Sequence, residues 1–435
     1  MSAISSPAPD EGPIQASLLP DNTEVLPGLP LQIGAVDLLE LAAKYGTPLF
    51  VYDEDHLRAR CREARESFDE GVAYATKAFL CRAMARIAFE EGLFLDVSTG
   101  GELHVALAAG VDPGSIVLHG SNKDTAELER AMEVGIGRIV IDSFDEIDRL
   151  EALARDLHSR IGVLIRATPG IEAHTHEYVR TGQQDSKFGF SVATGAASAA
   201  IERLRSIANV DLLGVHAHIG SQIFLATSFI EEVEVLAGML VPLELEELCI
   251  GGGLGVPYVA GESAPSISEW ATTVRDTARL AGVPESVRLT AEPGRAIAAS
   301  AAITLYTVGT IKELPGIRTY VSVDGGMSDN PRPVLYGSGY EAFLPRSPQA
   351  SRPRAVTIVG KHCETGDVVV ADARVPADLH LGDILATPVT GAYGYSMASN
   401  YNKVPRPAVV FVRQGEVRVV VRRESLDDLL SHDEA

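Results

Sequence analysis

Cysteine is scarce in this chain, and basic runs and long apolar segments are absent. The four cysteines, at positions 61, 81, 249 and 363, are too few and too far apart for a disulfide framework or a CxxC metal site. They suit a reduced cytoplasm. Glycine, proline or charge interrupts every apolar stretch before it reaches membrane-spanning length. The sequence therefore argues against a disulfide-rich secreted protein and against a membrane protein.

Positive charge is also outweighed by negative charge. The chain has 37 Lys and Arg against 59 Asp and Glu, a formal net charge of −22 at pH 7. Such a chain repels phosphate backbones and anionic lipids unless it carries a local basic patch, and none is visible. We expect neither nucleic acid nor a membrane among its partners.

The length of 435 residues predicts two domains, and the composition predicts a tail at each end. Residues 1–30 are proline-rich, carry only acidic charges and lack the features of a secretory signal, which predicts a disordered tail. Residues 425–435 form a second acidic tail that we expect to fray. Between them we expect a segment that packs with a β-domain (31–52), a barrel (53–302) and the C-terminal β-domain itself (303–424).

The barrel is predicted from eight short apolar runs that alternate with helical patterns. The runs are VAYAT, LFLDVS, SIVLHG, RIVID, IGVLIRA, LLGVHAHIG, ELCIGGG and VRLTAEPG. This alternation is typical of an α/β fold of the (β/α)₈ TIM-barrel type. After about residue 303, strand-like runs follow without long helical patterns, which predicts a mostly-β domain. The run LFVYD near residue 50 can supply one more strand to it.

One connection in the predicted barrel is unusually long. Residues 168–191 separate the fifth run from the sixth, and long loops inside compact domains are usually functional. We expect this connection to be mobile, to contain His174 and His176, and to cover the mouth of the barrel.

Active sites of such barrels lie at the carboxyl ends of the strands. Lys77 ends the first run in AYATKAF without a charged neighbour. Loss of hydration in such surroundings suits the neutral amine that forms a Schiff base. A surface lysine with its stem along apolar surface is the commoner alternative for this residue alone.

Two glycine-containing loops follow the seventh and eighth runs. They are GGGLG (251–255) and EPGR (292–295), where backbone amides can approach an oxyanion. Together with the lysine, they favour a phosphate-bearing aldehyde cofactor over two unrelated turns. Glu292 can hold a pyridine nitrogen protonated, although a salt bridge or a helix cap would also explain it.

Two histidines, His216 and His218, lie two apart on a predicted strand and point to the same face. No cysteine or carboxylate stands at ligand-like spacing from them. Stacking or hydrogen bonding is therefore favoured over metal binding, and no metal is expected.

Ten segments, in order, resemble the fold-type III decarboxylases that use pyridoxal 5'-phosphate (PLP) and have an alanine racemase-like barrel. They are AYATKAF, DVSTGGEL, HGSNKD, SKFGF, HAHIGSQ, IGGGLG, EPGR, DGGMSDNPRPVLYG, KHCETGD and GAYGYSMASNYN. The last four resemble the diaminopimelate decarboxylases within this group. HGSNKD departs from the group's pattern, with Ser121 and Asp124 in place of Asn and Ser.

The resemblance implies an enzyme that decarboxylates meso-2,6-diaminopimelate to L-lysine and CO₂, the last step of lysine biosynthesis. It implies that Lys77 forms the Schiff base with PLP, that His218 stacks on the ring, and that Glu292 pairs with the pyridine nitrogen. The residues implied to hold the phosphate are Ser221, Gly253 and the EPGR segment with Pro293, Gly294 and Arg295. The implied substrate contacts are Arg295, Arg332, Tyr336, Glu364 and Tyr393, the last of which also touches the cofactor.

The resemblance further implies that Cys363 donates the final proton, and that Cys363 and Glu364 come from the partner subunit of a homodimer with shared active sites. The chemistry agrees. Decarboxylation leaves a carbanion at Cα, which needs one proton, and a thiol can supply it. A distal carboxylate calls for a guanidinium group, and a distal ammonium calls for a carboxylate such as Glu364.

Three alternatives remain open from the residues. A decarboxylase of ornithine, arginine or a related basic amino acid on the same fold would leave Arg332 and Tyr336 without an anion to bind. A racemase needs an acid and a base on both faces of Cα, and no second lysine or tyrosine stands out. A non-catalytic PLP carrier would need only the barrel, whereas the chain continues with CETGD and GAY in later strands.

Overall fold

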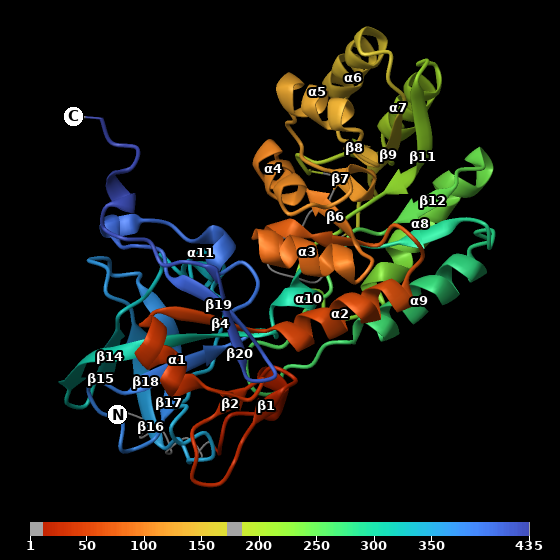
Figure 1. Cartoon of the computed structure of the whole chain (residues 1–435). Coiled ribbons are helices and arrows are strands. Elements are labelled where there is room, and N and C mark those ends of the chain that lie inside the picture. Colours follow the sequence, from red (N-terminus) through yellow and green to blue (C-terminus); the bar gives the residue numbers. More distant parts are fainter. Residues whose placement is uncertain (1–11, 172–184, 435) are drawn as a thin grey trace. The chain divides into compact units, whose positions relative to one another are not determined.

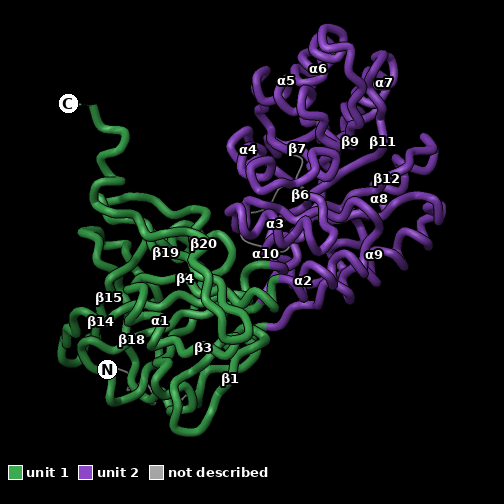
Figure 2. Tube along the Cα trace, in the orientation of Figure 1, with its two compact units in different colours: residues 1–57, 257–262, 298–435 green, residues 58–256, 263–297 purple. Residues whose placement is uncertain are grey.

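A computed structural model describes residues 12–171 and 185–434, which divide into two compact units (Figures 1 and 2). The barrel unit comprises residues 58–256 and 263–297, and the β unit comprises residues 1–57, 257–262 and 298–435. The division differs from the predicted boundaries, because the barrel unit starts later and ends earlier, and because six residues between them belong to the β unit.

The barrel unit contains the predicted ring of eight parallel strands. In order around the ring they are β5 (Ala73–Ala75), β6 (Phe94–Val97), β7 (Ile116–Leu118), β8 (Arg138–Ile141), β9 (Ile161–Thr168), β11 (Val210–His216), β12 (Glu247–Cys249) and β13 (Arg288–Thr290). Backbone hydrogen bonds from Ala73 to Ala291 (2.9 Å) and from Ala75 to Pro293 (3.3 Å) join the two ends. The predicted (β/α)₈ barrel is confirmed. Most residues of these strands are buried, as continuous apolar runs predict, and residues 211–213 of β11 are half-buried.

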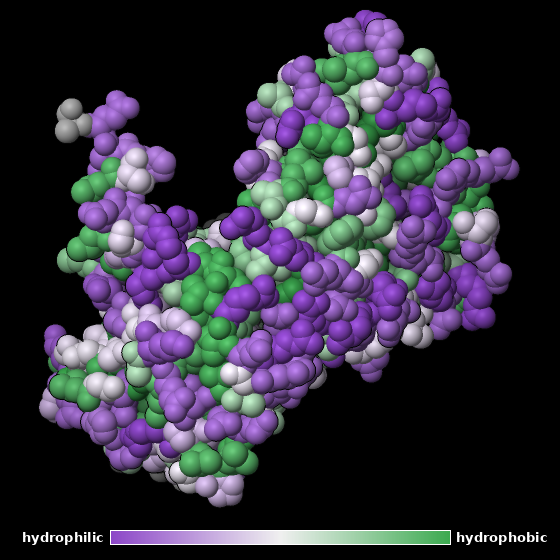
Figure 3. All heavy atoms as spheres, viewed as in Figure 1, coloured by the Kyte–Doolittle hydropathy of each residue, from purple (hydrophilic) through white to green (hydrophobic). Residues whose placement is uncertain are grey.

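Helices connect the strands on the outside of the barrel (Figure 1). They are α2 (Glu54–Ser67), α3 (Arg82–Glu90), α4 (Gly100–Ala108), α5 (Thr125–Val134), α6 (Phe144–Asp156), α7 (Ala196–Arg205), α8 (Ser228–Leu240) and α9 (Ile267–Leu280). In α9, Trp270 and Val274 are buried one turn apart, whereas Arg275 and Arg279 are exposed. The visible surface over α2 and α9 is accordingly hydrophilic (Figure 3). No helix in the described part of the chain is both long and apolar enough to cross a membrane.

Two of these helices begin with a capping box. Asp124 accepts a hydrogen bond from the Glu127 backbone at the start of α5, and Ser266 accepts one from Glu269 at the start of α9. Both glutamates bond back to the capping residue. Asp and Ser are equally good caps, so the Asp124 departure from the family pattern preserves the start of α5.

Replacing Ser266 with alanine is expected to lower the free energy of unfolding by about 1 kcal/mol, because the cap of α9 is lost. Urea unfolding followed by circular dichroism measures the change. Thr272→Ala on the exposed face of the same helix is the matched control and should change stability by no more than about 0.5 kcal/mol. Equal destabilisation by both variants would contradict the capping role.

The β unit is built around a mixed sheet. Its strands run in the order β17 (Val368–Val375), β16 (Arg354–Val359), β15 (Arg318–Val323), β14 (Ala302–Leu314), β4 (Leu49–Asp53), β19 (Ala408–Arg413) and β20 (Glu416–Val421), and β18 (Ile384–Pro388) pairs with β14. The LFVYD run is β4, which pairs with β14 on one side and β19 on the other. The sequence reading did not include β18.

The predicted disordered tail is wrong for residues 12–30. A short helix, η1 (Ala16–Leu18), places Leu18 in the core, and β1 (Thr23–Glu24) pairs with β2 (Gln32–Ile33), which pairs with β3 (Val36–Asp37). Asn22 also donates to Asp53. Buried leucines among the prolines outweigh the cost of ordering the chain here. Residues 1–11 lie outside the described residues.

The helix α1 (Leu38–Tyr45) follows β3 and is capped by Asp37. At the other end of the chain, the predicted fraying tail contains a hydrogen-bonded turn, η8 (Asp428–Leu430). Asp428 bonds to both Arg422 and Ser425. This local pairing was not expected from the acidic composition of residues 425–435.

Candidate active site

The predicted cofactor residues of the barrel unit gather at the carboxyl ends of its strands. Lys77 lies in the short helix η2 (Thr76–Ala78) that follows β5. His218 and Ser221 follow β11, Gly253 follows β12, and the EPGR segment joins β13 to the short helix α10 (Arg295–Ala298). Direct contacts link these loops: the Arg295 Nη2 donates to Ser221 Oγ (3.0 Å), and the Gly252 N–H donates to His218 Nδ1 (3.1 Å).

Lys77 is exposed, although its neighbours Thr76 and Ala78 are buried. The apolar neighbours of Lys77 therefore do not remove its amine from water, contrary to the expectation from the sequence. A second lysine, Lys123, follows β7, but its ammonium group is buried and bonds to two backbone carbonyls and to Glu146 (2.7 Å). Lys77 is thus the strand-end lysine whose amine is accessible to a ligand.

The glycines after β12 bring three loops together. A Cβ atom would lie 2.5 Å from Ala217 O at Gly251, 2.4 Å from Glu292 O at Gly252 and 2.4 Å from Gly220 O at Gly253. Gly251 and Gly253 also have φ of 58° and 113°, a region that side chains disfavour. Only glycine lets the backbone after β12 approach the loops after β11 and β13 this closely, beside Ser221 and Arg295.

Four buried side chains form a hydrogen-bonded cluster inside this ring of loops. His119 Nε2 lies 2.8 Å from Glu292 Oε1 and 3.8 Å from Asp96 Oδ1, and His216 Nε2 lies 3.0 Å from Glu292 Oε2. The two imidazole rings meet edge to face at 5.0 Å. Glu292 therefore has an imidazole nitrogen against each carboxylate oxygen.

The environment sets the charges of this cluster. Burial alone would raise the pKa of Glu292, but the adjacent His119 and His216 outweigh it and hold that pKa well below its usual range. Burial raises the pKa of Asp96 to about 6 and lowers that of His216 to about 4. Burial, followed by the cations Lys77 and Arg166, holds the pKa of His218 well below its usual range. Glu292 is an anion and His218 is neutral at pH 7.

His119, His216 and Glu292 are also the one group in the described part of the chain whose donor atoms lie close enough to share a metal ion. Arg166, from β9, is buried and acts electrostatically on the same three side chains. A divalent ion would add to that positive charge. A shared-proton network is the better physical description, because each carboxylate oxygen already has an imidazole partner.

The sequence reading missed Asp96, His119 and Arg166 as site residues, and it left His216 without a specific partner. Each lies in or directly after a barrel strand, as Lys77 does. Position at a strand end, which pointed to Lys77, therefore points to these residues as well. Their partners are distant in sequence, however, and only the closed barrel brings His119 and Glu292 together.

The long connection after β9 is partly described. Residues 172–184, with His174 and His176, lie outside the described residues, so the predicted cover over the barrel mouth stays a prediction. The returning end is anchored: Phe188 packs under the guanidinium of Arg166 (4.4 Å), the Gly189 N–H donates to Asp142 (2.8 Å), and β10 (Phe190–Ser191) pairs with β9.

The predicted substrate residues lie in the β unit. Arg332 opens the short helix α11 (Arg332–Tyr336) and is 4% exposed. Its guanidinium stacks on the ring of Tyr258 (4.4 Å) and donates to Ser338 (2.9 Å), while its Nε has no hydrogen-bond partner among the described residues. Tyr336, at the end of the same helix, is half-buried. A buried guanidinium with an unused donor is suited to an anionic ligand.

Tyr393 is a second residue of the β unit with features of a ligand site, and it acts electrostatically on Arg332. Its φ is 58°, in the left-handed region that side chains rarely adopt. Strained backbone of this kind clusters at ligand sites.

Cys363 and Glu364 are both exposed on the loop between β16 and β17. Hydrogen bonds hold the backbone of this loop in place: the buried Asp367 accepts from the backbone of Met327 (2.6 Å) and of His362 (2.8 Å). The Cys363 N–H donates to Asn402 (3.1 Å). The structure thus presents both side chains outward and joins their loop to the DGGMSD segment.

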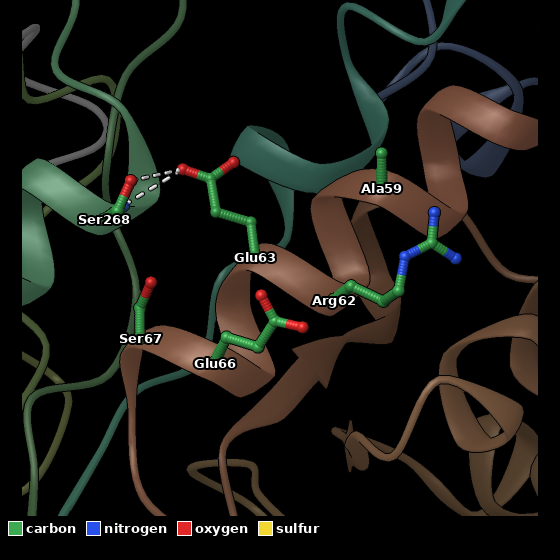
Figure 4. A pocket seen from close by; sticks show the side chains of 6 residues that line it. All are labelled: Ala59, Arg62, Glu63, Glu66, Ser67 and Ser268. Atoms are coloured by element: carbon green, nitrogen blue, oxygen red, sulfur yellow. Dashed lines mark hydrogen bonds between the residues drawn. The ribbon is translucent and has the colours of Figure 1, made fainter.

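A separate surface pocket lies between α2 and α9 (Figure 4). It is lined by Ala59, Arg62, Glu63, Glu66, Ser67 and Ser268. Glu63 accepts two hydrogen bonds from Ser268 and forms an ion pair with Arg60 (2.7 Å), so its charge is already partnered. None of the predicted site residues lines this pocket.

Comparison with known proteins decides the family. Residues 54–299 match the family model of the pyridoxal-dependent decarboxylases, pyridoxal binding domain. The diaminopimelate decarboxylase of Mycobacterium tuberculosis is 48% identical over 419 residues, which cover 92% of this chain and 94% of that protein. The chain belongs to the diaminopimelate decarboxylase family. A relative from Bacillus subtilis is 46% identical over 93% of this chain and 95% of its own length.

Solved structures of diaminopimelate decarboxylases agree. The crystal structure from M. jannaschii has a TM-score of 0.88 at 32% identity and covers 95% of this chain and 98% of its own. A co-complex of that protein with L-lysine aligns equally well, at 33% identity. A lysine/ornithine decarboxylase from Vibrio vulnificus, at 22% identity and a TM-score of 0.72, shares the fold.

The cofactor of this decarboxylase family is PLP, and the residues present fit it. Ser221, Arg295 and the glycine loop offer donors to a phosphate, and neutral His218 offers an uncharged ring to stack upon. Anionic Glu292 suits a protonated pyridine nitrogen. Lys77 has the accessible amine that an aldehyde requires.

Proposed function

We propose that the chain decarboxylates meso-2,6-diaminopimelate to L-lysine and CO₂, the last step of lysine biosynthesis. The observation that carries the choice of substrate is Arg332, a buried guanidinium in the β unit that has tyrosines and Ser338 around it but no carboxylate partner in the described part of the chain. A substrate with a second carboxylate pairs with that guanidinium. Ornithine, arginine and lysine have no distal carboxylate and would leave it unsatisfied, at a cost.

In this proposal Lys77 anchors the cofactor, His218 packs against its ring, Glu292 accepts its pyridinium N–H, and Ser221, Gly253 and the EPGR segment bind its phosphate. Bound PLP supplies the electron sink for the electron pair left at Cα when CO₂ departs. Cys363 delivers a proton to that carbon. The distal centre of the substrate is held by Arg332, Tyr336 and Glu364, while Arg295 and Tyr393 contact the substrate near the cofactor.

The functional unit in this proposal is a cytoplasmic homodimer, in which Cys363 and Glu364 complete the partner's site. Two observations support it. The side chains of Cys363 and Glu364 are exposed on a loop that Asp367 holds in place, and residues that contact a partner subunit have to be exposed in the single chain. All four cysteines are free thiols, which suits a reducing compartment.

The substrate is tested by incubating purified protein and PLP with meso-diaminopimelate, ornithine, arginine or lysine while CO₂ release is followed. Release from diaminopimelate alone is the expected result. Faster release from ornithine or arginine would replace the proposal with a basic amino-acid decarboxylase.

Replacing Arg332 with alanine is expected to reduce kcat/KM for diaminopimelate by one to two decades. Loss of a charge-assisted contact costs roughly 1.5–3 kcal/mol, which corresponds to that factor. The visible spectrum of bound PLP should stay unchanged. Arg354→Ala, which removes a half-buried arginine paired with the exposed Glu313, is the matched control and should stay within about twofold of wild type. Unchanged kinetics of Arg332→Ala would remove this residue from the site.

A further inference from the structure

His119 is a buried histidine placed between two buried carboxylates. It follows β7, whereas Asp96 lies in β6 and Glu292 follows β13, so three strands converge on one imidazole. Its side chain is 7% exposed, and those of Asp96 and Glu292 are 5% and 8% exposed. Nε2 makes the 2.8 Å contact to Glu292, and Asp96 Oδ1, which has no hydrogen-bond partner among the described residues, faces the same nitrogen at 3.8 Å.

Two buried carboxylates side by side require positive charge nearby, because an unpaired buried anion is very costly. The charged and titratable groups that act on this cluster come from several sides of the barrel: Lys77 after β5, Asp96 in β6, Glu102 in α4, Arg166 in β9, His216 in β11 and Glu292 after β13. Arg166 is shared with Asp142, at 3.7 Å. Lys77 is exposed and is the residue proposed to bind the cofactor.

The two histidines that contact Glu292 differ in the charge they can carry. Burial lowers the pKa of His216 to about 4, so His216 contacts Glu292 as a neutral donor. Burial would also lower the pKa of His119, but the carboxylates of Asp96 and Glu292 outweigh it and raise that pKa above its usual value. His216 faces one carboxylate and His119 faces two, which is the physical origin of the difference.

We propose that His119 is a positioning residue that acts through Glu292: as an imidazolium held between Asp96 and Glu292, it keeps the Glu292 carboxylate ionised for the pyridine nitrogen of the cofactor. The role of Glu292 toward the cofactor rests on the proposed function. The protonation of His119 rests on the chain alone. His119 touches neither the substrate nor the reacting carbon in this assignment, and its effect passes through the charge of Glu292.

The first test uses the full-length protein without PLP, and it needs a variant only to assign the His119 signals. Nitrogen chemical shifts of ¹⁵N-labelled histidine distinguish an imidazolium from a neutral ring, and the His119→Gln spectrum identifies the His119 signals. At pH 7 both His119 nitrogens should carry protons, and the ring should titrate above the ordinary histidine range. In Glu292→Gln the titration midpoint should fall, because one of the two carboxylates is gone. A neutral His119 at pH 7 in the wild-type protein would overturn the proposal.

The second test compares His119→Gln with His216→Gln in the PLP-loaded protein. Glutamine can still donate a hydrogen bond to Glu292 but carries no charge, so it separates charge from geometry. His119→Gln should lower kcat about tenfold with KM within about twofold, weaken PLP binding, and move the acid limb of the kcat profile to higher pH, because Glu292 then ionises at higher pH. His216→Gln should leave the acid limb in place.

The two tests separate the possible failures. A wild-type protein that binds PLP and shows an imidazolium at His119 but does not decarboxylate diaminopimelate would refute the proposed substrate and leave the His119 assignment standing. Identical acid limbs in wild type and His119→Gln, with PLP affinity unchanged, would overturn the positioning role. If His119→Gln fails to fold, Asp96→Asn identifies the His119 signals instead, because Asp96 faces His119 and does not act on His216, and the wild-type spectrum then still decides the protonation state.

Discussion

Replacing Lys77 with alanine is expected to abolish decarboxylation, with a loss of more than about 10⁴-fold, as is typical when a covalent catalytic group is removed. Lys77 is the accessible lysine at the strand ends, since the amine of Lys123 is committed to Gly120, Val140 and Glu146. Wild-type protein with PLP should absorb in the visible region, and borohydride should fix the cofactor to the peptide that contains Lys77.

The control for this experiment is Lys44→Ala, which removes an exposed lysine from α1 and should retain full activity and the same adduct. Mass spectrometry of the reduced, digested protein identifies the modified lysine. A borohydride-fixed adduct in Lys77→Ala, on Lys123 or any other lysine, would show that the assignment is wrong.

Replacing Cys363 with alanine is expected to slow product formation by about 10²–10⁴-fold without releasing PLP, because proton delivery by a positioned group is typically worth that factor. The thiol is exposed, and the backbone of its loop is held by Asp367 and Asn402. Removing the thiol should therefore leave the loop in place. Stopped-flow measurement of lysine formation, together with the PLP spectrum, checks both parts. Cys81→Ala, in the barrel unit, is the matched thiol control.

Mixing the inactive Lys77→Ala and Cys363→Ala proteins tests whether the sites are shared. If each site takes Lys77 from one chain and Cys363 from the other, a mixed dimer has one site with both wild-type residues. Statistical mixing makes about half of the dimers mixed, so activity should recover toward about a quarter of wild type. A mixture that stays as inactive as its parents, despite proven subunit exchange, would exclude shared sites.

The barrel was predictable from sequence because its strands are buried on both sides and therefore read as continuous apolar runs. Each of the eight runs overlaps one observed strand. The N-terminal segment was not predictable in the same way. Its prolines and acidic residues indicate disorder, whereas its anchoring partners lie elsewhere in the chain: Asn22 donates to Asp53, and Arg352 donates to the Gly12 carbonyl. The strand β18 is short and ends in Pro388, so its sequence is difficult to distinguish from that of a loop.

Those site residues were predictable whose position in the sequence alone indicates a role. Lys77 and Glu292 follow strands and are conspicuous in apolar surroundings. Asp96 and His119 also lie in or directly after strands, but the role of each depends on a partner on another strand, which the sequence alone does not identify. Arg332 was selected through resemblance, but its stack on Tyr258 and its unused donor become visible only when residues 257–262 join the β unit.

The position of β4 has a consequence for the order in which the chain folds. This strand is fully buried between β14 and β19, and Leu49 pairs with Ala408 near the other end of the sequence. On the ribosome, β4 emerges early, whereas its second neighbour emerges only when synthesis is almost complete. The barrel unit is synthesised in full during that interval, so an unpaired apolar strand edge has to be kept from other chains until the last strands arrive.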